Sequence, residues 1–192
     1  MRKSGSIILL GGMLLLLGSF SLDPTPVPVT SPTPAPETDI HWLTWEQATE
    51  KMKTEKRKFI VDIYTDWCGW CKRMDAATFQ QPYIAKYVNE HYYAIKFNAE
   101  QKQEIQYKGK NFKFVNNGQR GYHELVAEIT NGRFGYPTVV FLDENMNVIQ
   151  AINGYKGPDD FEMIMTYFAQ DYHKKVPWDK YQRSYQPLPH DE

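Results

Sequence analysis

The chain has 192 residues, two cysteines and a formal net charge of −1. Its 23 acidic and 22 basic residues are nearly balanced, and nucleic-acid binding requires an excess of positive charge, so nucleic acid is not an expected partner. A scaffold built on several disulfides is excluded by the cysteine count. The length suits one domain with a hydrophobic core of its own.

The first 21 residues have the pattern of a secretory signal peptide. Arg2 and Lys3 precede an apolar stretch at 7–20, and Ser19 and Ser21 suit the −3 and −1 positions of a cleavage site. The apolar stretch is shorter than the roughly 20 residues of a membrane-spanning helix. We therefore expect a periplasmic or secreted protein, with an uncleaved anchor in the inner membrane as the alternative.

A proline-rich segment at 22–39 follows, in which small and polar residues alternate with proline. Such a segment is extended, semi-rigid and without a core, so we interpret it as a linker. A proline-rich ligand for a partner protein is the alternative interpretation. The folded domain is expected at 40–175, and the tail at 176–192 is expected to pack across its surface.

The domain is predicted to begin with a helix, a strand and a second helix. Thr44 and Gln47 match a capping box and predict a helix that continues to about Arg57. The β-branched and aromatic run 59–65 predicts a buried strand. Helix-compatible sequence then extends from about Trp70.

The middle of the domain is predicted to contain a helix, a strand and a hairpin. Pro82 suits the first turn of a helix that reaches about Asn89. Residues 92–98 predict a strand, and the alternating pattern on either side of Lys108-Gly109-Lys110 predicts a hairpin of 104–107 with 111–115.

The last part of the domain is predicted to contain two helices with a hairpin between them. Residues 122–130 predict a helix that ends at Asn131-Gly132. Residues 138–142 and 147–152 predict an apolar hairpin, and Pro158 starts the last helix. The sheet is therefore expected to be mixed, with helices across parallel strands and an antiparallel hairpin at the end.

The two cysteines lie in one motif, Cys68-Gly69-Trp70-Cys71, between the predicted strand and helix. This spacing places Cys68 at the start of the helix, where unpaired N–H groups and the helix dipole favour a thiolate, and Cys71 one turn further along. A pair in this context is typical of a redox site.

Two alternatives to a redox pair stay open at this point. A structural zinc site needs two more ligands, whereas the five histidines are isolated from one another. A structural disulfide would close a very short loop and would constrain the unfolded chain little. A haem attachment motif is excluded because Lys72, and not histidine, follows the second cysteine.

The segment 62–72 resembles the strand and active-site turn of the thioredoxin superfamily. Asp62 matches the buried acid of that family, and Lys96 matches the lysine near it on the next strand. Residues 135–138 resemble the cis-proline loop, and Gly154 resembles the glycine that shapes the substrate groove. The resemblance implies an α/β, thioredoxin-like fold with a mixed central sheet flanked by helices.

Two features depart from a minimal member of the family. Gly69-Trp70 stands between the cysteines where the reducing thioredoxins carry Gly-Pro, which leaves the direction of electron flow open. The hairpin at 104–115 is an insertion before the cis-proline loop. The segment 66–79 is similar to exported thioredoxin-like reductases and to the C-terminal domain of thiol:disulfide interchange proteins.

The resemblance and the residue types together predict catalytic roles. Cys68 is expected to be the nucleophile, and Cys71 is expected to resolve the mixed disulfide. Asp62 is the candidate base, since burial in an apolar strand raises a carboxyl pKa. Lys96 and Lys72 are expected to tune these pKa values. The alternatives are an Asp62 that reaches solvent and a Lys96 that is simply exposed.

Further residues are expected to bind the substrate. Pro137, after a cis peptide bond with Tyr136, presents backbone groups to the incoming peptide in the family, where Gly154 shapes the groove. Trp70 is expected to offer an exposed docking surface, although burial against the inserted hairpin is an equal alternative. Trp67 is expected to support the packing.

The sequence as a whole predicts an exported thiol:disulfide oxidoreductase that reduces protein disulfides. No metal and no bound cofactor are expected, because the Cys68–Cys71 disulfide carries the electrons. The expected partners are disulfide-containing client proteins and an electron-donor protein, for which a membrane-embedded carrier is one candidate. The rival readings are a disulfide oxidase or isomerase, and a peptide-binding or chaperone module with an idle redox pair.

Overall fold

The computed structural model describes residues 39–189 except 117 and 119. The predicted signal peptide and nearly all of the predicted linker lie outside the described residues. Within the described part, no helix is both long and apolar enough to cross a membrane. The strands are β1 (Trp42–Leu43), β2 (Lys58–Tyr64), β3 (Tyr92–Asn98), β4 (Ile105–Tyr107), β5 (Lys110–Phe112), β6 (Phe114–Val115), β7 (Tyr122–His123), β8 (Thr138–Leu142) and β9 (Val148–Asn153).

Five strands form the central sheet in the order β1-β3-β2-β8-β9. The pairs β1–β3 and β2–β3 are parallel, whereas β8 runs antiparallel to both β2 and β9. The expected mixed sheet, completed by an antiparallel hairpin, is therefore confirmed. β1 was not predicted, because two residues are too few to show a strand pattern.

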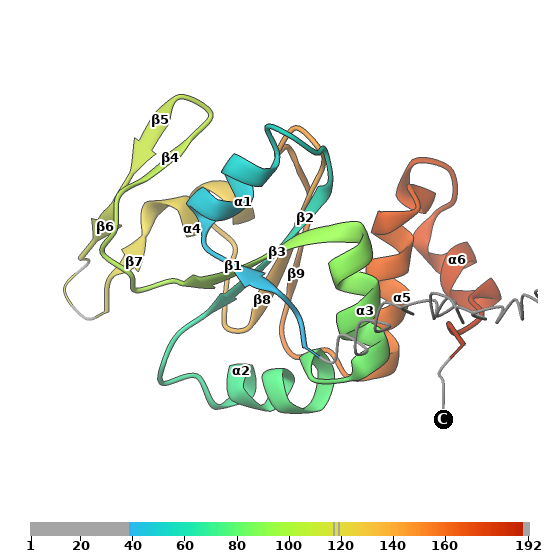
Figure 1. The fold of residues 1–192 in the computed structure, drawn as a ribbon. Helices are drawn as coiled ribbons and strands as arrows, with labels where there is room; N and C mark the ends of the chain where they lie inside the picture. Colours follow the sequence, from blue (N-terminus) through green and yellow to red (C-terminus); the bar gives the residue numbers. More distant parts are fainter. Residues whose placement is uncertain (1–38, 117, 119, 190–192) are drawn as a thin grey trace, which may run out of the picture. The chain divides into compact units, whose positions relative to one another are not determined.

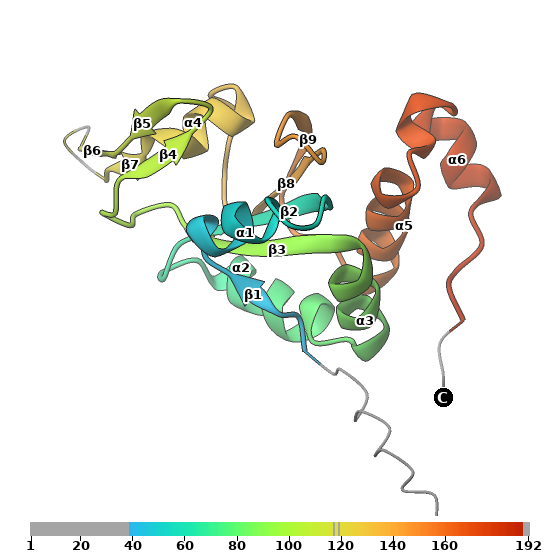
Figure 2. The ribbon, with the colours of Figure 1, turned by 45° about the horizontal axis from the view of Figure 1, so that its top comes forward.

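Helices cover both faces of this sheet (Figures 1 and 2). Side chains of α1 and α4 pack in the core on one face, and those of α2, α3 and α5 pack in the core on the other. The helices are α1 (Trp45–Lys51), α2 (Gly69–Met74), the π-helix η1 (Asp75–Phe79), α3 (Pro82–His91), α4 (Glu124–Thr130), α5 (Pro158–Ala169), the 3-10 helix η2 (Tyr172–Lys174) and α6 (Trp178–Ser184).

Strand β2 supplies both cores because alternate side chains point to opposite faces. Phe59, Val61 and Ile63 face α1 and α4, while Ile60 lies in the core beneath α2 and α3. Asp62 has the parity of Ile60, so its carboxyl group points to the face that α2 covers.

The capping box predicted at the start of α1 is confirmed. Thr44 Oγ1 accepts a hydrogen bond from Gln47 N at 3.2 Å, and Gln47 Oε1 accepts one from Thr44 N at 2.9 Å. The predicted end near Arg57 is wrong, because α1 ends at Lys51. Beyond Lys51, the N–H groups of Lys53 and Thr54 each donate at 3.1 Å to the carbonyl oxygen three residues back, so the helix ends in tighter turns.

The segment 104–123, which contains the predicted insertion at 104–115 and is called the inserted segment below, forms two short hairpins instead of the single one predicted. β4 pairs with β5 around a turn at Lys108-Gly109, as expected, but β6 pairs with β7. The second predicted strand, 111–115, is therefore divided between the two hairpins. The helix predicted from Tyr122 begins at Glu124, because His123 is its N-cap and its ring Nδ1 accepts a hydrogen bond from Leu125 N at 3.2 Å.

The tail after residue 175 packs on α5, and α6 within it was not predicted. Tyr181 is buried, and its hydroxyl lies 2.8 Å from that of Thr166. The Glu162 carboxylate accepts hydrogen bonds from the Tyr185 hydroxyl at 2.5 Å and from Leu188 N at 2.6 Å. The described part of the tail is thus held by hydrogen bonds as well as by aromatic packing.

Candidate active site

Cys68 and Cys71 form a disulfide at the end of β2 and the start of α2, with Cα atoms 5.3 Å apart. Cys68 is the N-cap residue of α2, and its Sγ accepts a hydrogen bond from Cys71 N at 3.0 Å. Cys68 is 5% exposed and Cys71 is 2% exposed. Both cysteines are thus largely buried, and Cys68 is the one at the helix N-terminus, where a thiolate would be stabilised once the pair is reduced.

Asp62 lies in the middle of β2 with only 1% of its surface exposed. In register with it on β3 is Lys96, whose Nζ lies 2.6 Å from Asp62 Oδ2, while Oδ1 accepts no hydrogen bond from any described residue. Burial raises the pKa of Asp62 to about 6, although the charge of Lys96 opposes the rise. The alternative in which Asp62 reaches solvent is excluded.

Lys96 is shared by two carboxylates, because Asp75 also forms an ion pair with it. Burial lowers the pKa of Lys96, but its interactions with Asp62 and Asp75 outweigh that effect, and the net shift is upward. The ammonium group also lies 4.8 Å from the centre of the Trp42 ring and 5.3 Å from that of Phe79. Lys96 is therefore a charged neighbour of Asp62, and the alternative of a simply exposed lysine is excluded.

Asp75 is the residue that sequence reasoning missed. It comes four residues after Cys71, at the point where α2 continues as η1. In a helix, residues four apart lie on the same face, and this spacing was the available signal. Its nearness also raises the pKa of Asp62, so the pair Asp62–Lys96 is in fact a group of three.

The loop before β8 and the turn after β9 lie together. The Tyr136–Pro137 peptide bond is cis, and the Pro137 carbonyl oxygen accepts a hydrogen bond from Gly154 N at 2.8 Å. Gly154 has a φ of +82°, in the left-handed region that favours glycine. The three residues assigned to one substrate groove from the sequence, Tyr136, Pro137 and Gly154, are thus brought side by side.

Aromatic rings connect this loop and turn to the cysteines. Trp67 meets Tyr136 edge to face at 5.7 Å between ring centres, and Trp70 lies 5.6 Å from Tyr155. Trp67 is 50% exposed and Trp70 is 61% exposed, so both indoles form part of the surface around the disulfide. The expected exposure of Trp70 is observed, whereas its alternative burial against the inserted hairpin is not.

Residues 45–169, more than half of the chain, match the model of the thioredoxin-like domain family. The chain belongs to this family. Among solved structures, the DsbH oxidoreductase superposes with a TM-score of 0.51 at 17% identity, over 77% of this chain and 95% of that one. A thioredoxin from Thermus thermophilus gives a TM-score of 0.49 at 12% identity, over 77% and 98% of the two chains.

A curated relative, an uncharacterised protein of Caenorhabditis elegans, is 25% identical over 122 residues. The match covers 63% of this chain and spans 15% of that protein's length. The fold of the present chain is accordingly thioredoxin-like, with a mixed central sheet flanked by helices. The family and the Cys68–Cys71 pair together support thiol–disulfide redox chemistry.

Lys72 is exposed on α2 and forms no ion pair with any described residue, so its tuning role stays a prediction.

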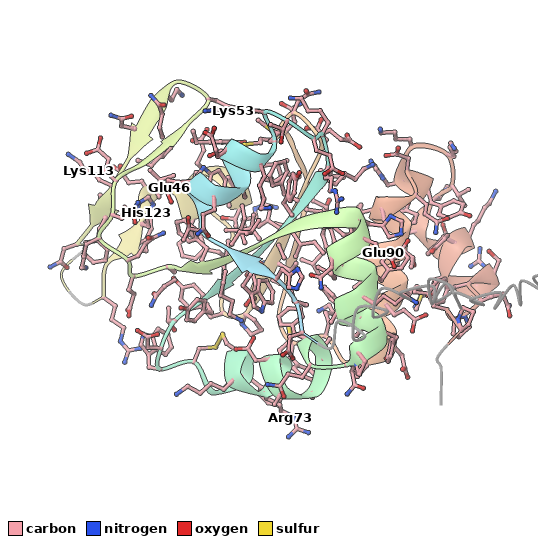
Figure 3. The ribbon with its side chains drawn as sticks, viewed as in Figure 1. Glu46, Lys53, Arg73, Glu90, Lys113 and His123 are labelled. Carbon is pink, nitrogen blue, oxygen red and sulfur yellow. A yellow bond between two sulfur atoms is a disulfide. The ribbon has the colours of Figure 1, made fainter. Side chains whose placement is uncertain are left out.

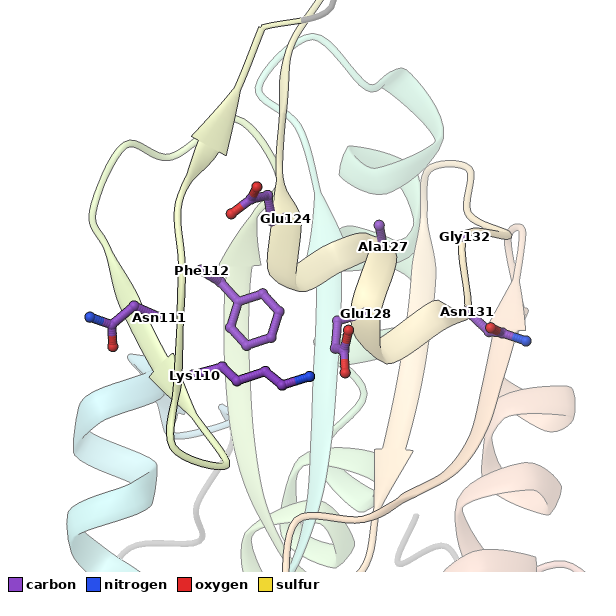
Figure 4. Close-up of a pocket in the computed structure, with 8 residues that line it drawn as sticks. All are labelled: Lys110, Asn111, Phe112, Glu124, Ala127, Glu128, Asn131 and Gly132. Atoms are coloured by element: carbon purple, nitrogen blue, oxygen red, sulfur yellow. The ribbon is translucent and has the colours of Figure 1, made fainter.

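A hollow of about 680 Å³ lies between β5 and α4, with Lys110 and Glu128 directed into it from opposite sides (Figure 4). None of the site residues predicted from the sequence lines it.

The alternative of a structural zinc site requires two further ligands close to the cysteines. Its described residues contain no group of three or more histidine, cysteine, aspartate or glutamate side chains that could hold a metal ion. The two sulfurs are joined to each other.

Proposed function

We propose that this protein is an exported thiol:disulfide oxidoreductase that reduces disulfides in client proteins. The observation that carries the proposal is the Cys68–Cys71 pair at the N-terminus of α2, with the buried Asp62 on the sheet face that this helix covers. A sulfur at a helix N-terminus, a second sulfur one turn behind it and a carboxyl group with a raised pKa are suited to the nucleophile, the resolving thiol and the base of a dithiol–disulfide cycle.

The reaction starts from the reduced pair. The Cys68 thiolate attacks one sulfur of a client disulfide, forms a mixed disulfide and expels the other client sulfur as a thiolate. The Cys71 thiol then gives its proton to Asp62, and its thiolate attacks Cys68 Sγ. The Cys68–Cys71 disulfide forms, the second client sulfur leaves, and two electrons have passed to the client.

Asp62 is suited to this proton transfer by its pKa. With a pKa of about 6 it is mostly ionised at pH 7, so it can accept a proton, and it is more basic than an exposed aspartate. The positive charge of Lys96 limits the rise in the pKa of Asp62. A higher pKa would leave Asp62 protonated at pH 7 and unable to act as a base.

The client chain is proposed to lie along Tyr136, Pro137 and Gly154, with Trp70 as an apolar contact at the side. The exposure of Trp70 and the hydrogen bond between Pro137 and Gly154 support this placement. Electrons would come from a donor protein, with a membrane-embedded carrier as one candidate. No bound cofactor is required, because the disulfide itself is the electron carrier. The N-terminal sequence supports export to the periplasm or beyond.

The direction of the reaction is tested by rates measured both ways with the full mature chain. The reduced protein is mixed with insulin whose disulfides are intact, and the oxidised protein is mixed with a reduced, unfolded protein that contains two cysteines. We expect disulfide reduction to be the faster of the two reactions in a glutathione buffer. Faster oxidation of the dithiol substrate would contradict the proposal and identify an oxidase. Lack of either reaction above the buffer rate would favour a binding module.

A further inference from the structure

The inserted segment begins and ends beside the redox site. His123 N donates a hydrogen bond to the Ala99 carbonyl oxygen at 2.7 Å, and Ala99 N donates to the Tyr64 carbonyl oxygen at 2.8 Å. The insertion therefore extends from the ends of β2 and β3, just before the turn that carries Cys68. Buried His123 anchors its base, since its ring Nε2 lies 2.9 Å from the Gln103 carbonyl oxygen (Figure 3).

Arg120 from this insertion contacts the residue next to the nucleophile. Its guanidinium carbon lies 4.1 Å from the centre of the Trp67 ring, and Trp67 immediately precedes Cys68. The Trp67 indole N–H donates to Glu100 Oε1 at 3.1 Å, so its edge is occupied by a carboxylate while its face is covered by the cation. Arg120 is exposed and forms no ion pair with any residue that the structure describes.

The position of Arg120 is defined by the residue after it. A Cβ atom on Gly121 would collide with the Phe114 ring and with the Val115 carbonyl oxygen, so the backbone approaches β6 more closely than any other residue type allows. On the other side, Tyr122 lies 5.3 Å from Phe134, which in turn lies 6.1 Å from Tyr136 in the cis-proline loop. Packing thus places the insertion against both catalytic loops.

We propose that Arg120 is a specificity-determining residue that favours client disulfides with an acidic side chain next to the reacting cysteine. This proposal rests on the proposed function, because the peptide must reach Cys68 to meet Arg120. A guanidinium group stacked on an indole keeps its N–H donors at the edge of the plane, in the geometry that binds a carboxylate with two hydrogen bonds. Glu100 opposes an acidic ligand, but it is half-buried and accepts the Trp67 N–H.

The test uses the full chain with Cys71→Ser, which stops the reaction at the mixed disulfide. The probes are three short peptides, each with one cysteine linked by a disulfide to thionitrobenzoate, that differ only in a Glu, Gln or Lys beside the cysteine. Attack of Cys68 on the peptide sulfur forms the mixed disulfide and releases coloured thionitrobenzoate. Dividing each rate constant by that of free glutathione removes the intrinsic reactivity of the peptide.

We expect Arg120→Ala to lower the rate ratio of the Glu peptide to the Gln peptide by about two- to fivefold, the range of an exposed charge pair. The rate ratio of the Lys peptide to the Gln peptide should rise in the same variant. Added salt should weaken the fall of the first ratio and the rise of the second. Arg120→Lys, which keeps the charge without the planar donors, should fall in between. The matched control is Arg73→Ala on α2, whose side chain points away from the domain and whose removal should leave the ratios unchanged (Figure 3).

Two results would overturn the proposal. If Arg120→Ala lowers the rate constants of all three peptides by the same factor, the arginine only positions Trp67. If the rate constants and the Glu-to-Gln ratio are all unchanged, Arg120 does not interact with the charge of the peptide. Failure of every peptide to react, while the same peptides react with glutathione, would contradict the proposed function itself. A reaction that proceeds without charge preference would leave the proposed function intact and reject this inference alone.

Discussion

Replacement of Cys68 by serine is expected to abolish disulfide reduction, with at least a thousandfold loss of rate, because a serine hydroxyl at neutral pH is not a nucleophile towards sulfur. Cys68 is the N-cap of α2, where the helix N-terminus favours a thiolate, whereas Cys71 lies one turn inside the helix, so Cys71 is not expected to replace it in the first step. The measurement is the rate of insulin disulfide reduction by the full chain with dithiothreitol as the electron source.

Cys71→Ser is the matched variant, because it lacks the same disulfide but keeps the nucleophile. It should accumulate a mixed disulfide with the client, visible as a mass equal to the sum of protein and client chain. If Cys68→Ser instead accumulates the adduct and Cys71→Ser does not, the two roles are reversed. If both variants reduce insulin as the parent does, the pair is a structural disulfide.

The Asp62→Asn variant is expected to unfold at a higher denaturant concentration than the parent at pH 7. Burial raises the pKa of Asp62 from 3.8 to about 6, so ionisation of this group costs the folded state up to about 3 kcal/mol relative to the unfolded chain. Asparagine is neutral and similar in shape, and it removes that cost. Urea unfolding monitored by circular dichroism measures the gain.

The pH dependence of this gain follows from the same shift. Below about pH 3 the carboxyl group is protonated in both the folded and the unfolded states, so the variant gains nothing. As pH rises to about 6 the folded parent retains a proton that the unfolded chain has lost, and its stability falls relative to the variant. Above about pH 7 both states have lost the proton and the difference is constant. A gain that is equal at pH 3 and pH 7 would contradict the raised pKa.

The same variant should slow the second chemical step. Without the carboxylate, release of the client from the mixed disulfide should be slower by about one to two orders of magnitude near pH 7, the effect expected for loss of a general base. The first step should be little changed, because it uses the Cys68 thiolate. Asp75→Asn is the matched control: it leaves the base in place but removes a carboxylate that raises the pKa of Asp62, so the pH midpoint should move downward.

Much of the central sheet and of the site was predictable because it depends on local patterns. The run 59–65 predicts the buried strand that the structure shows as β2, and the Cys68-x-x-Cys71 spacing predicts the start of α2. Asp62 and Lys96 were found through resemblance to a family, and the register of β2 with β3 shows why they meet.

What the sequence did not show depends on contacts between distant segments. Asp75 lies four residues after Cys71, a spacing that indicates the same helix face, but its ion pair with Lys96 depends on the packing of α2 against β3, which the sequence pattern does not show. Arg120 lies 53 positions after Trp67, and only the pairing of β6 with β7 places it on that ring. The division between the two hairpins falls at Lys113, which donates its N–H to Glu124 Oε2 at 3.0 Å and accepts from Glu124 N at 2.9 Å, a contact between segments that the local pattern does not show.

The equilibrium reduction potential of the Cys68–Cys71 pair is the most direct test of the central claim, that this thioredoxin-like protein works as a reductase. The fraction of dithiol is measured in a series of glutathione or dithiothreitol buffers. We predict a value near that of thioredoxin, about −270 mV, at which the reduced pair gives electrons to client disulfides. A value of about −120 to −180 mV, the range of disulfide oxidases and isomerases, would contradict the account and reverse the direction of electron flow.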